Sequence, residues 1–364
     1  MTNEERLILL LSRLTFEDGL AGQIEAVLKG SISWDAVYRL SLHHGVSSLL
    51  CHNFKRLKLD VPREIIEKFG AAYWATVAQN IRLYDELERI LNGVAHEGVE
   101  AIVLKGIPLC RCLYQDLGLR PSGDIDLLIR FDDLVRLSPS LRSMGYLPTG
   151  EDIQELVRRN WFKTGFFKKN GFPVSLEIHW NCVQPTRARP NIDLMWTRRQ
   201  NIAMDGLSLR LLSYEDMLLY LCAHLSYHSF DLRLIWMCDL HEIISQKGLT
   251  LDWSYIFKQA NQQRLQTPLF VALDYLRSVF GADIPANILK EIKINDLRRA
   301  YLNAFFDQGT LGYFRYPMNF LKREMFRLFL IDRPMDRLVF CFVGLKRRRA
   351  GEWLSLFTHS ESRN

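Results

Sequence analysis

The fold is decided by the stretch Arg120-Pro121-Ser122-Gly123-Asp124-Ile125-Asp126-Leu127-Leu128-Ile129. Its turn-forming first half and apolar second half predict a β-strand that begins at Asp124. Because side chains alternate along a strand, Asp124 and Asp126 leave one face, while Ile125 and Leu127 point into the core. Two carboxylates held this close repel each other unless a cation lies between them, and such an oxygen-rich site suits Mg²⁺. An exposed pair of aspartates at a strand start is the alternative that this stretch alone leaves open.

A third carboxylate is predicted on another strand of the same sheet. The run Val174-Ser175-Leu176-Glu177-Ile178-His179-Trp180 alternates strictly and follows the turn Asn170-Gly171. Glu177 therefore faces away from the core together with His179. If this strand lies beside the one that carries Asp124 and Asp126, three carboxylates converge, and divalent ions bound to nucleotide phosphates are the usual way to stabilise such a cluster. The alternatives are a surface glutamate and a surface histidine.

A phosphate-binding turn is the next candidate feature. The β-branched run Val99 to Leu104 predicts a buried strand that ends at Lys105-Gly106, before a helix from about Pro108 to Leu117. Glycine lets the backbone approach a phosphate and lysine supplies positive charge, although Lys-Gly turns are also common without a ligand. Arg120 either clamps a phosphate or caps the preceding helix.

Helices are predicted on both sides of this strand-rich segment. Apolar residues repeat at close to 3.6-residue spacing from about Pro62 to Ala95, and a capping sequence at Ser213 begins a second helical region. Further helices are expected at about 230–246, 252–264, 267–280 and 320–348. The predicted fold class is α+β, with a helical region over 1–95, an α/β core with a small mixed sheet over 96–210, and a helical region over 211–364.

These motifs resemble a known family. Val103-Leu104-Lys105-Gly106, Leu113-Tyr114, Arg120 to Ile129 and Glu177-Ile178-His179-Trp180 are similar in order and type to the uncharacterised bacterial nucleotidyltransferases of the DNA polymerase β-like superfamily. The resemblance covers roughly residues 95–245 and includes Leu221-Cys222-Ala223-His224 and Leu234 to Leu240. It implies that Asp124 and Asp126 hold two divalent ions, Mg²⁺ or Mn²⁺, that Glu177 is the third carboxylate, and that Lys105-Gly106 replaces the superfamily's Gly-Ser turn, since Ile107 follows Gly106. The candidate nucleotide-binding residues are Lys105, Gly106, Arg120, Ser122 and Gly123.

The function expected from these residues is metal-dependent nucleotidyl transfer. An acceptor hydroxyl or phosphate attacks the α-phosphate of a nucleoside triphosphate in line, and pyrophosphate leaves. One ion, bridged by Asp124, Asp126 and Glu177, lowers the pKa of the acceptor hydroxyl, and the second accompanies the triphosphate. The acceptor is a small molecule, a peptide or protein, or, less favoured, RNA. The alternative function is a non-catalytic nucleotide-binding or antitoxin-like module with the same fold.

Histidines and one acidic residue of the second helical region are further candidates. His224 and His228 are four residues apart on a predicted helix, a spacing compatible with a metal, a buried histidine or an acceptor-side role. His179 is the other candidate for the acceptor side. Asp239 and Arg233 either pair between helices or face the cleft.

Composition narrows the class of protein. The chain has 364 residues, 48% of them hydrophobic, a net charge of +6 and seven cysteines. An odd number of cysteines without paired spacing argues against a secreted disulfide framework, and no signal peptide or transmembrane run is predicted, so the cytoplasm is the expected location. The basic run Lys346-Arg347-Arg348-Arg349 is either a solvated helix end or a contact with an acidic membrane or nucleic acid. The modest net charge argues against a dedicated nucleic-acid-binding protein.

Overall fold

Seven strands within the described residues form one mixed sheet flanked by helices, so the fold class is α+β as predicted. The computed structural model describes residues 1–16, 19–150, 155–156, 161–204, 206–230, 233–305 and 320–349. The strand order is β3-β4-β5-β2-β1-β7-β6. The strands are β1 (Ile102–Val103), β2 (Asp124–Leu128), β3 (Leu147–Pro148), β4 (Lys163–Lys168), β5 (Val174–His179), β6 (Gln200–Met204) and β7 (Leu207–Leu211).

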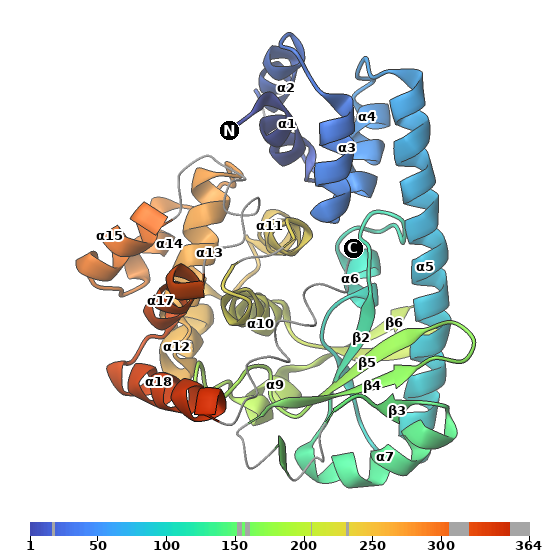
Figure 1. Cartoon of the computed structure of the whole chain (residues 1–364), viewed down its shortest axis with the longest axis vertical. Coiled ribbons are helices and arrows are strands. Elements are labelled where there is room, and N and C mark those ends of the chain that lie inside the picture. Colours follow the sequence, from blue (N-terminus) through green and yellow to red (C-terminus); the bar gives the residue numbers. More distant parts are fainter. Residues whose placement is uncertain are drawn as a thin grey trace.

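The sheet separates two hydrophobic cores. Ile125 and Leu127 of β2 pack in one core with Leu176 and Ile178 of β5 and with residues of α5 (Arg63–His96) and α7 (Leu134–Ser143). Figure 1 shows both helices against this side of the sheet. Leu128 of β2 belongs to the other core, which the N-terminal and C-terminal helices build. Because Asp124 and Asp126 share the face of Leu128, they point towards this second layer of helices.

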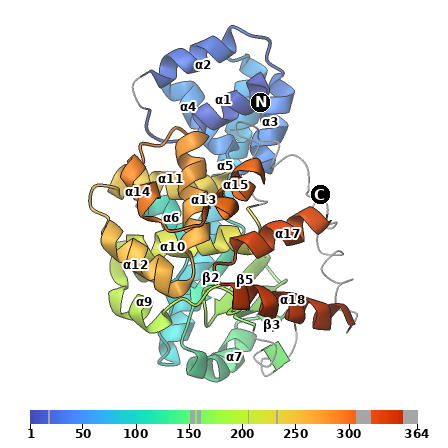
Figure 2. The ribbon, with the colours of Figure 1, turned by 90° about the vertical axis from the view of Figure 1, so that its left-hand side faces the viewer.

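The N-terminal helices form one end of the molecule, and α5 connects this end to the sheet (Figures 1 and 2). The predicted long helix from Pro62 to Ala95 is confirmed as α5 (Arg63–His96), a single continuous helix of 34 residues. The preceding helices are α1 (Asn3–Leu11), α2 (Leu20–Leu28), α3 (Trp34–His43) and α4 (Ser47–Arg56). Besides α7, the helices between the strands in the described part of the chain are α6 (Ile107–Cys112), the 3₁₀-helix η1 (Phe131–Asp133) and α9 (Ile192–Arg198).

The C-terminal helices lie beside the sheet, with α10 nearest to it in Figure 1. The single helix predicted over 320–348 is wrong, because the structure has two helices separated at Ile331 to Arg333. Pro334 begins the second one, a position where its missing N–H costs nothing. These helices are α10 (Tyr214–Tyr227), α11 (Ile235–Lys247), α12 (Trp253–Gln263), α13 (Gln266–Ser278), α14 (Ala286–Glu291), α15 (Asp296–Phe305), α17 (Phe320–Leu330) and α18 (Pro334–Arg349).

Two features bear on the sequence predictions about membranes. Within the described part of the chain, no helix combines the length and apolar character needed to cross a bilayer. The basic run Lys346 to Arg349 forms the end of the α18 backbone, but its side chains lie outside the described residues.

Candidate active site

The structure places Asp126 and Glu177 side by side. Strands β2 and β5 are parallel neighbours, and Asp126 pairs in register with Glu177, while Asp124 pairs with Ser175. Paired positions on neighbouring strands project from the same face, so the carboxylates of Asp124, Asp126 and Glu177 gather on one side of the sheet. Their exposure differs: the side chain of Asp126 is 0% exposed, that of Glu177 27% and that of Asp124 37%.

His179 completes a group that has the composition of a metal site. Its Nε2 atom lies 3.1 Å from Asp126 Oδ1 and 3.4 Å from Glu177 Oε2. One ligand atom each from Asp126, Glu177 and His179 falls within 4.8 Å of the others. Carboxylate oxygens suit Mg²⁺ and Mn²⁺, and imidazole is a ligand for transition metals in general. His179 Nδ1 is buried without a hydrogen-bond partner among the described residues. The donor set therefore fits a divalent ion.

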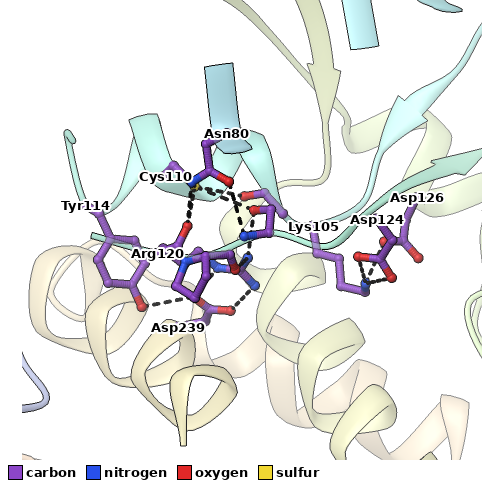
Figure 3. A network of polar contacts seen from close by, with 11 residues as sticks. Asn80, Lys105, Cys110, Tyr114, Arg120, Asp124, Asp126 and Asp239 are labelled. Atoms are coloured by element: carbon purple, nitrogen blue, oxygen red, sulfur yellow. Dashed lines mark hydrogen bonds and ion pairs between the residues drawn. The ribbon is translucent and has the colours of Figure 1, made fainter. Parts of the chain in front are cut away.

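Lysines neutralise the carboxylates. Lys105 Nζ lies 2.5 Å from Asp126 Oδ2 and 3.3 Å from both carboxylate oxygens of Asp124, a contact drawn in Figure 3. On the other side, Lys163 of β4 places Nζ 2.5 Å from Glu177 Oε2. Lys105 was predicted at a phosphate-binding turn, and it does follow β1, but in this structure its ammonium contacts the carboxylates. Lys163 was missed because the alternation of β4 was not recognised in the sequence.

Burial and charge shift the pKa values of these groups in opposite directions. Burial, and then the charge of Asp126, raise the pKa of the Asp124 carboxyl against the opposing effect of Lys105. Burial would also raise the pKa of Asp126, but Lys105 and the hydrogen bond from His179 outweigh it, so that pKa is lowered. The pKa of Glu177 is lowered because His179 and Lys163 outweigh its burial. The pKa of His179 is raised by Asp126 and Glu177 despite burial. The carboxylates of Asp126 and Glu177 are thus stabilised as anions, and the same two carboxylates favour the protonated form of His179.

Gly106 shapes the turn after Lys105. Its φ of +82° and ψ of −123° lie in a region of backbone conformation that residues other than glycine rarely adopt. A Cβ atom at this position would meet only ordinary contacts, the nearest being the Asp124 carbonyl oxygen at 3.5 Å. The backbone conformation, rather than lack of space, therefore requires glycine here. The turn brings the chain close to the strand that carries Asp124.

Arg120 lies in a buried ion pair. Its Nε donates to Asp239 Oδ1 at 2.8 Å and its Nη2 donates to Oδ2 at 2.7 Å, so its guanidinium is engaged within the protein, and phosphate binding by Arg120 stays a prediction. The Tyr114 hydroxyl also donates to Asp239 Oδ1, at 2.9 Å (Figure 3). The predicted pairing of Asp239 with Arg233 is therefore wrong, and Arg233 is exposed. Arg120 instead ties the segment before Asp124 to α11.

Asn80 of α5 fixes the same segment from the other side. Its Nδ2 donates to the Arg120 carbonyl at 2.8 Å, and its Oδ1 accepts from the Ser122 backbone N–H at 3.2 Å (Figure 3). Ser122 is itself buried, and its hydroxyl accepts from Arg120. Of the five predicted nucleotide-binding residues, Arg120 and Ser122 are thus engaged within the protein, while Gly123 is exposed next to Asp124.

The His224 ring lies in an aromatic group on α10 and α11. The ring centroid of His224 lies 4.8 Å from that of His228 and 4.8 Å from that of Trp236. Burial is the main reason that the pKa of His224 lies well below its ordinary value and that the pKa of His228 falls to about 3; nearby lysines lower both further. Both histidines are therefore neutral at pH 7. His224 Nε2 is buried with no hydrogen-bond partner among the described residues.

Tyr220, one turn before His224, was missed by the sequence analysis. Its hydroxyl is buried without a partner within the described part of the chain. Burial raises the pKa of this hydroxyl well above its ordinary value, and the charges of Asp126, Glu177 and Asp124 raise it further. Tyr220 and His224 thus share a helix face within electrostatic range of the carboxylates. The helical spacing of four residues was the available signal.

A family of known proteins and a solved structure are similar to this chain. A sequence profile of a family described as uncharacterised nucleotidyltransferase matches residues 30–281, more than half of the chain. No curated protein matches the chain. Among solved structures, an antigenic nucleotidyltransferase-like protein from Paracoccidioides brasiliensis is similar, with 20% identity and a TM-score of 0.39 over 63% of this chain and 97% of the other.

Proposed function

The chain belongs to the family of uncharacterised nucleotidyltransferases, and we propose on this premise that it transfers a nucleoside monophosphate from a nucleoside triphosphate to an acceptor, with release of pyrophosphate. The observation that carries the proposal is the register of β2 and β5, which pairs Asp126 with Glu177 and leaves Asp124 on the same face. We also assign the core to the DNA polymerase β-like superfamily, on the resemblance of its motifs.

Asp124, Asp126 and Glu177 are proposed to hold Mg²⁺ or Mn²⁺, with His179 as a further ligand or as a hydrogen-bond donor to them. Bound divalent ions supply Lewis-acid stabilisation of phosphate charge and lower the pKa of an acceptor hydroxyl. Asp126 is the central residue, because it is fully buried and contacts both Lys105 and His179. Its position is fixed by the pairing of β2 with β5.

Lys105 and Gly106 are proposed to bind the triphosphate. Lys105 ends in three N–H donors, and Gly106, which is buried in this structure, has no side chain to keep a phosphate away from its backbone. Arg120 is proposed as a positioning residue, since its ion pair with Asp239 fixes the segment that leads into Asp124. The nucleotide-binding residues of this proposal are Lys105, Gly106 and Gly123.

The acceptor is proposed to approach along α10, where Tyr220 and His224 present polar atoms without partners among the described residues. A neutral His224 can accept a proton and the Tyr220 hydroxyl can donate a hydrogen bond, which suits a hydroxyl acceptor on a small molecule, peptide or protein. His179, the other acceptor-side candidate, is engaged with Asp126 and Glu177.

A non-catalytic nucleotide-binding module is the second candidate function. The observation that favours it is that Lys105 and Lys163 already neutralise the carboxylates. Such a module would bind a nucleoside triphosphate without consuming it, and would be recognised by a stoichiometric complex that releases no pyrophosphate.

Substitution of Asp126 tests the catalytic proposal. The protein is incubated with each labelled nucleoside triphosphate, Mg²⁺ or Mn²⁺ and a cell extract, and the nucleotidylated product is identified by mass spectrometry. Asp126→Asn removes one charge at nearly constant shape, so labelling should fall at least roughly a hundredfold, since the change removes electrostatic stabilisation of the transition state. Glu67→Gln, at an exposed position of α5, is the matched control. Retention of most labelling by a folded Asp126→Asn variant would refute the assignment.

A further inference from the structure

We propose that the Lys105 ammonium and a divalent ion compete for Asp126, and that the triphosphate resolves this competition by taking the ammonium. Metal and nucleotide then bind together, and metal alone binds weakly. This inference rests on the proposed function, because it specifies how the same site is loaded.

Both oxygens of Asp126 are already occupied by donors. Oδ1 accepts from His179 Nε2 at 3.1 Å, and Oδ2 lies 2.5 Å from Lys105 Nζ. The carboxylate is 0% exposed, so no third direction of approach from solvent remains. A divalent ion that binds Asp126 must therefore replace one of the two donors, or face a positive charge at close range.

Lys105 is the donor that can leave. The ring of His179 is joined to the backbone of β5 by a short side chain, so it cannot move far, and the ring is itself a potential metal ligand. Lys105 has a long, flexible side chain, and its amine also contacts Asp124, whose side chain is 37% exposed. The ammonium therefore lies between the buried carboxylate and the solvent-facing one. A short displacement past Asp124 would bring the Lys105 ammonium to a phosphate bound on the solvent-exposed side of Asp124.

The triphosphate is the partner that would draw the ammonium outwards. Its oxygens carry several negative charges and form charge-assisted hydrogen bonds with lysine. Lys105 lies next to Gly106, whose turn approaches Asp124, so the two proposed phosphate-binding residues and the carboxylates adjoin. Once Lys105 contacts phosphate, Asp126 Oδ2 becomes available to the ion that the triphosphate brings.

The first measurement is the affinity of each protein for Mn²⁺ alone, determined by electron paramagnetic resonance. Lys105→Met removes the competing charge, so its Mn²⁺ affinity should exceed that of the wild type by roughly tenfold or more. Lys105→Arg keeps the charge and should retain weak binding, and Lys68→Met, which changes an exposed lysine of α5, should match the wild type. Thermal unfolding of each variant, with and without Mn²⁺, shows that the folded protein is being compared.

The second measurement uses the complex of Mn²⁺ with inorganic tripolyphosphate, which carries the phosphates without a base. Wild type should bind this complex much more tightly than Mn²⁺ alone, and Lys105→Met should lose most of that preference. Equal Mn²⁺ affinity of wild type and Lys105→Met, with no effect of tripolyphosphate, would overturn the inference while leaving the metal site in place. If none of the proteins binds Mn²⁺ in either form, the metal site of the proposed function fails as well.

Discussion

Removing the charge of Asp239 should destabilise the whole fold, because it leaves Arg120 charged and buried. The side chains of Arg120 and Asp239 are 4% and 0% exposed, and two hydrogen bonds join them. Breaking one partner of such a pair costs about 3–5 kcal/mol. Since the free energy of unfolding of natural domains is about 5–15 kcal/mol, Asp239→Asn should remove a large part of the total stability.

Urea unfolding followed by circular dichroism measures this loss. Asp239→Asn keeps an oxygen that can accept from the Tyr114 hydroxyl and from Arg120 Nε, but it places an amide N–H opposite Arg120 Nη2, so it removes both the charge and one acceptor. The double variant Arg120→Met/Asp239→Asn leaves no unpaired charge at this position and should recover part of the stability lost by Asp239→Asn, because the cost of breaking a buried pair lies mainly in the uncompensated charge. This recovery is the signature of a coupled pair.

Two outcomes would refute the reasoning about this pair. A loss below about 1 kcal/mol in Asp239→Asn would place the pair in the range of solvent-screened surface ion pairs. Additive effects of the two single substitutions would show that Arg120 and Asp239 act independently.

Two further predictions concern protonation and the acceptor. Burial, and then the charges of His43 and Arg233, lower the pKa of His44 from 6.5 to about 4, so the unfolded chain binds the proton first and stability falls as the pH drops through this window. At pH 5 the neutral His44 lowers the free energy of unfolding by about 2 kcal/mol. Urea midpoints measured at pH 7 and pH 5 should therefore show a smaller loss of stability in His44→Gln than in wild type. Equal losses in the two proteins would contradict this prediction. His224→Asn and Tyr220→Phe should lower the rate of transfer, for His224→Asn by roughly a hundredfold, with little change in nucleotide affinity measured by calorimetry; a parallel loss of affinity would place both residues on the nucleotide side instead.

The face of the sheet that each carboxylate occupies was predictable from sequence because it depends on strand periodicity, whereas the pairing of β2 with β5 was only a condition of the prediction. Alternation puts Asp124 and Asp126 on one face of β2 and Glu177 on one face of β5, whatever the side chains later contact. The long helix α5 was predictable for a similar reason, since its apolar positions repeat over many turns.

Contacts between distant parts of the chain were not predictable in this way. Arg120 and Asp239 are 119 residues apart, and neither helix nor strand periodicity says which of several charged residues will meet. Strand β4 was missed because Gly165 and the lysines at its two ends interrupt the apolar pattern. The β6–β7 hairpin was missed because its strands carry few β-branched residues, although the sequence Asp205-Gly206 between them is a strong hairpin signal.

The charges at the site explain how the protein can bury Asp126 before any ligand binds. Lys105 contacts Asp124 and Asp126, Lys163 contacts Glu177, and His179 hydrogen-bonds to Asp126, so each carboxylate has a partner from the chain itself. A buried carboxylate without a counter-ion would be strongly destabilising, and an ion supplied only by solution would make folding depend on metal. Because this chain provides its own cations, chelation should remove activity without unfolding the protein. Loss of nucleotidyl transfer after chelation therefore reports on the chemistry of the site rather than on the stability of the fold.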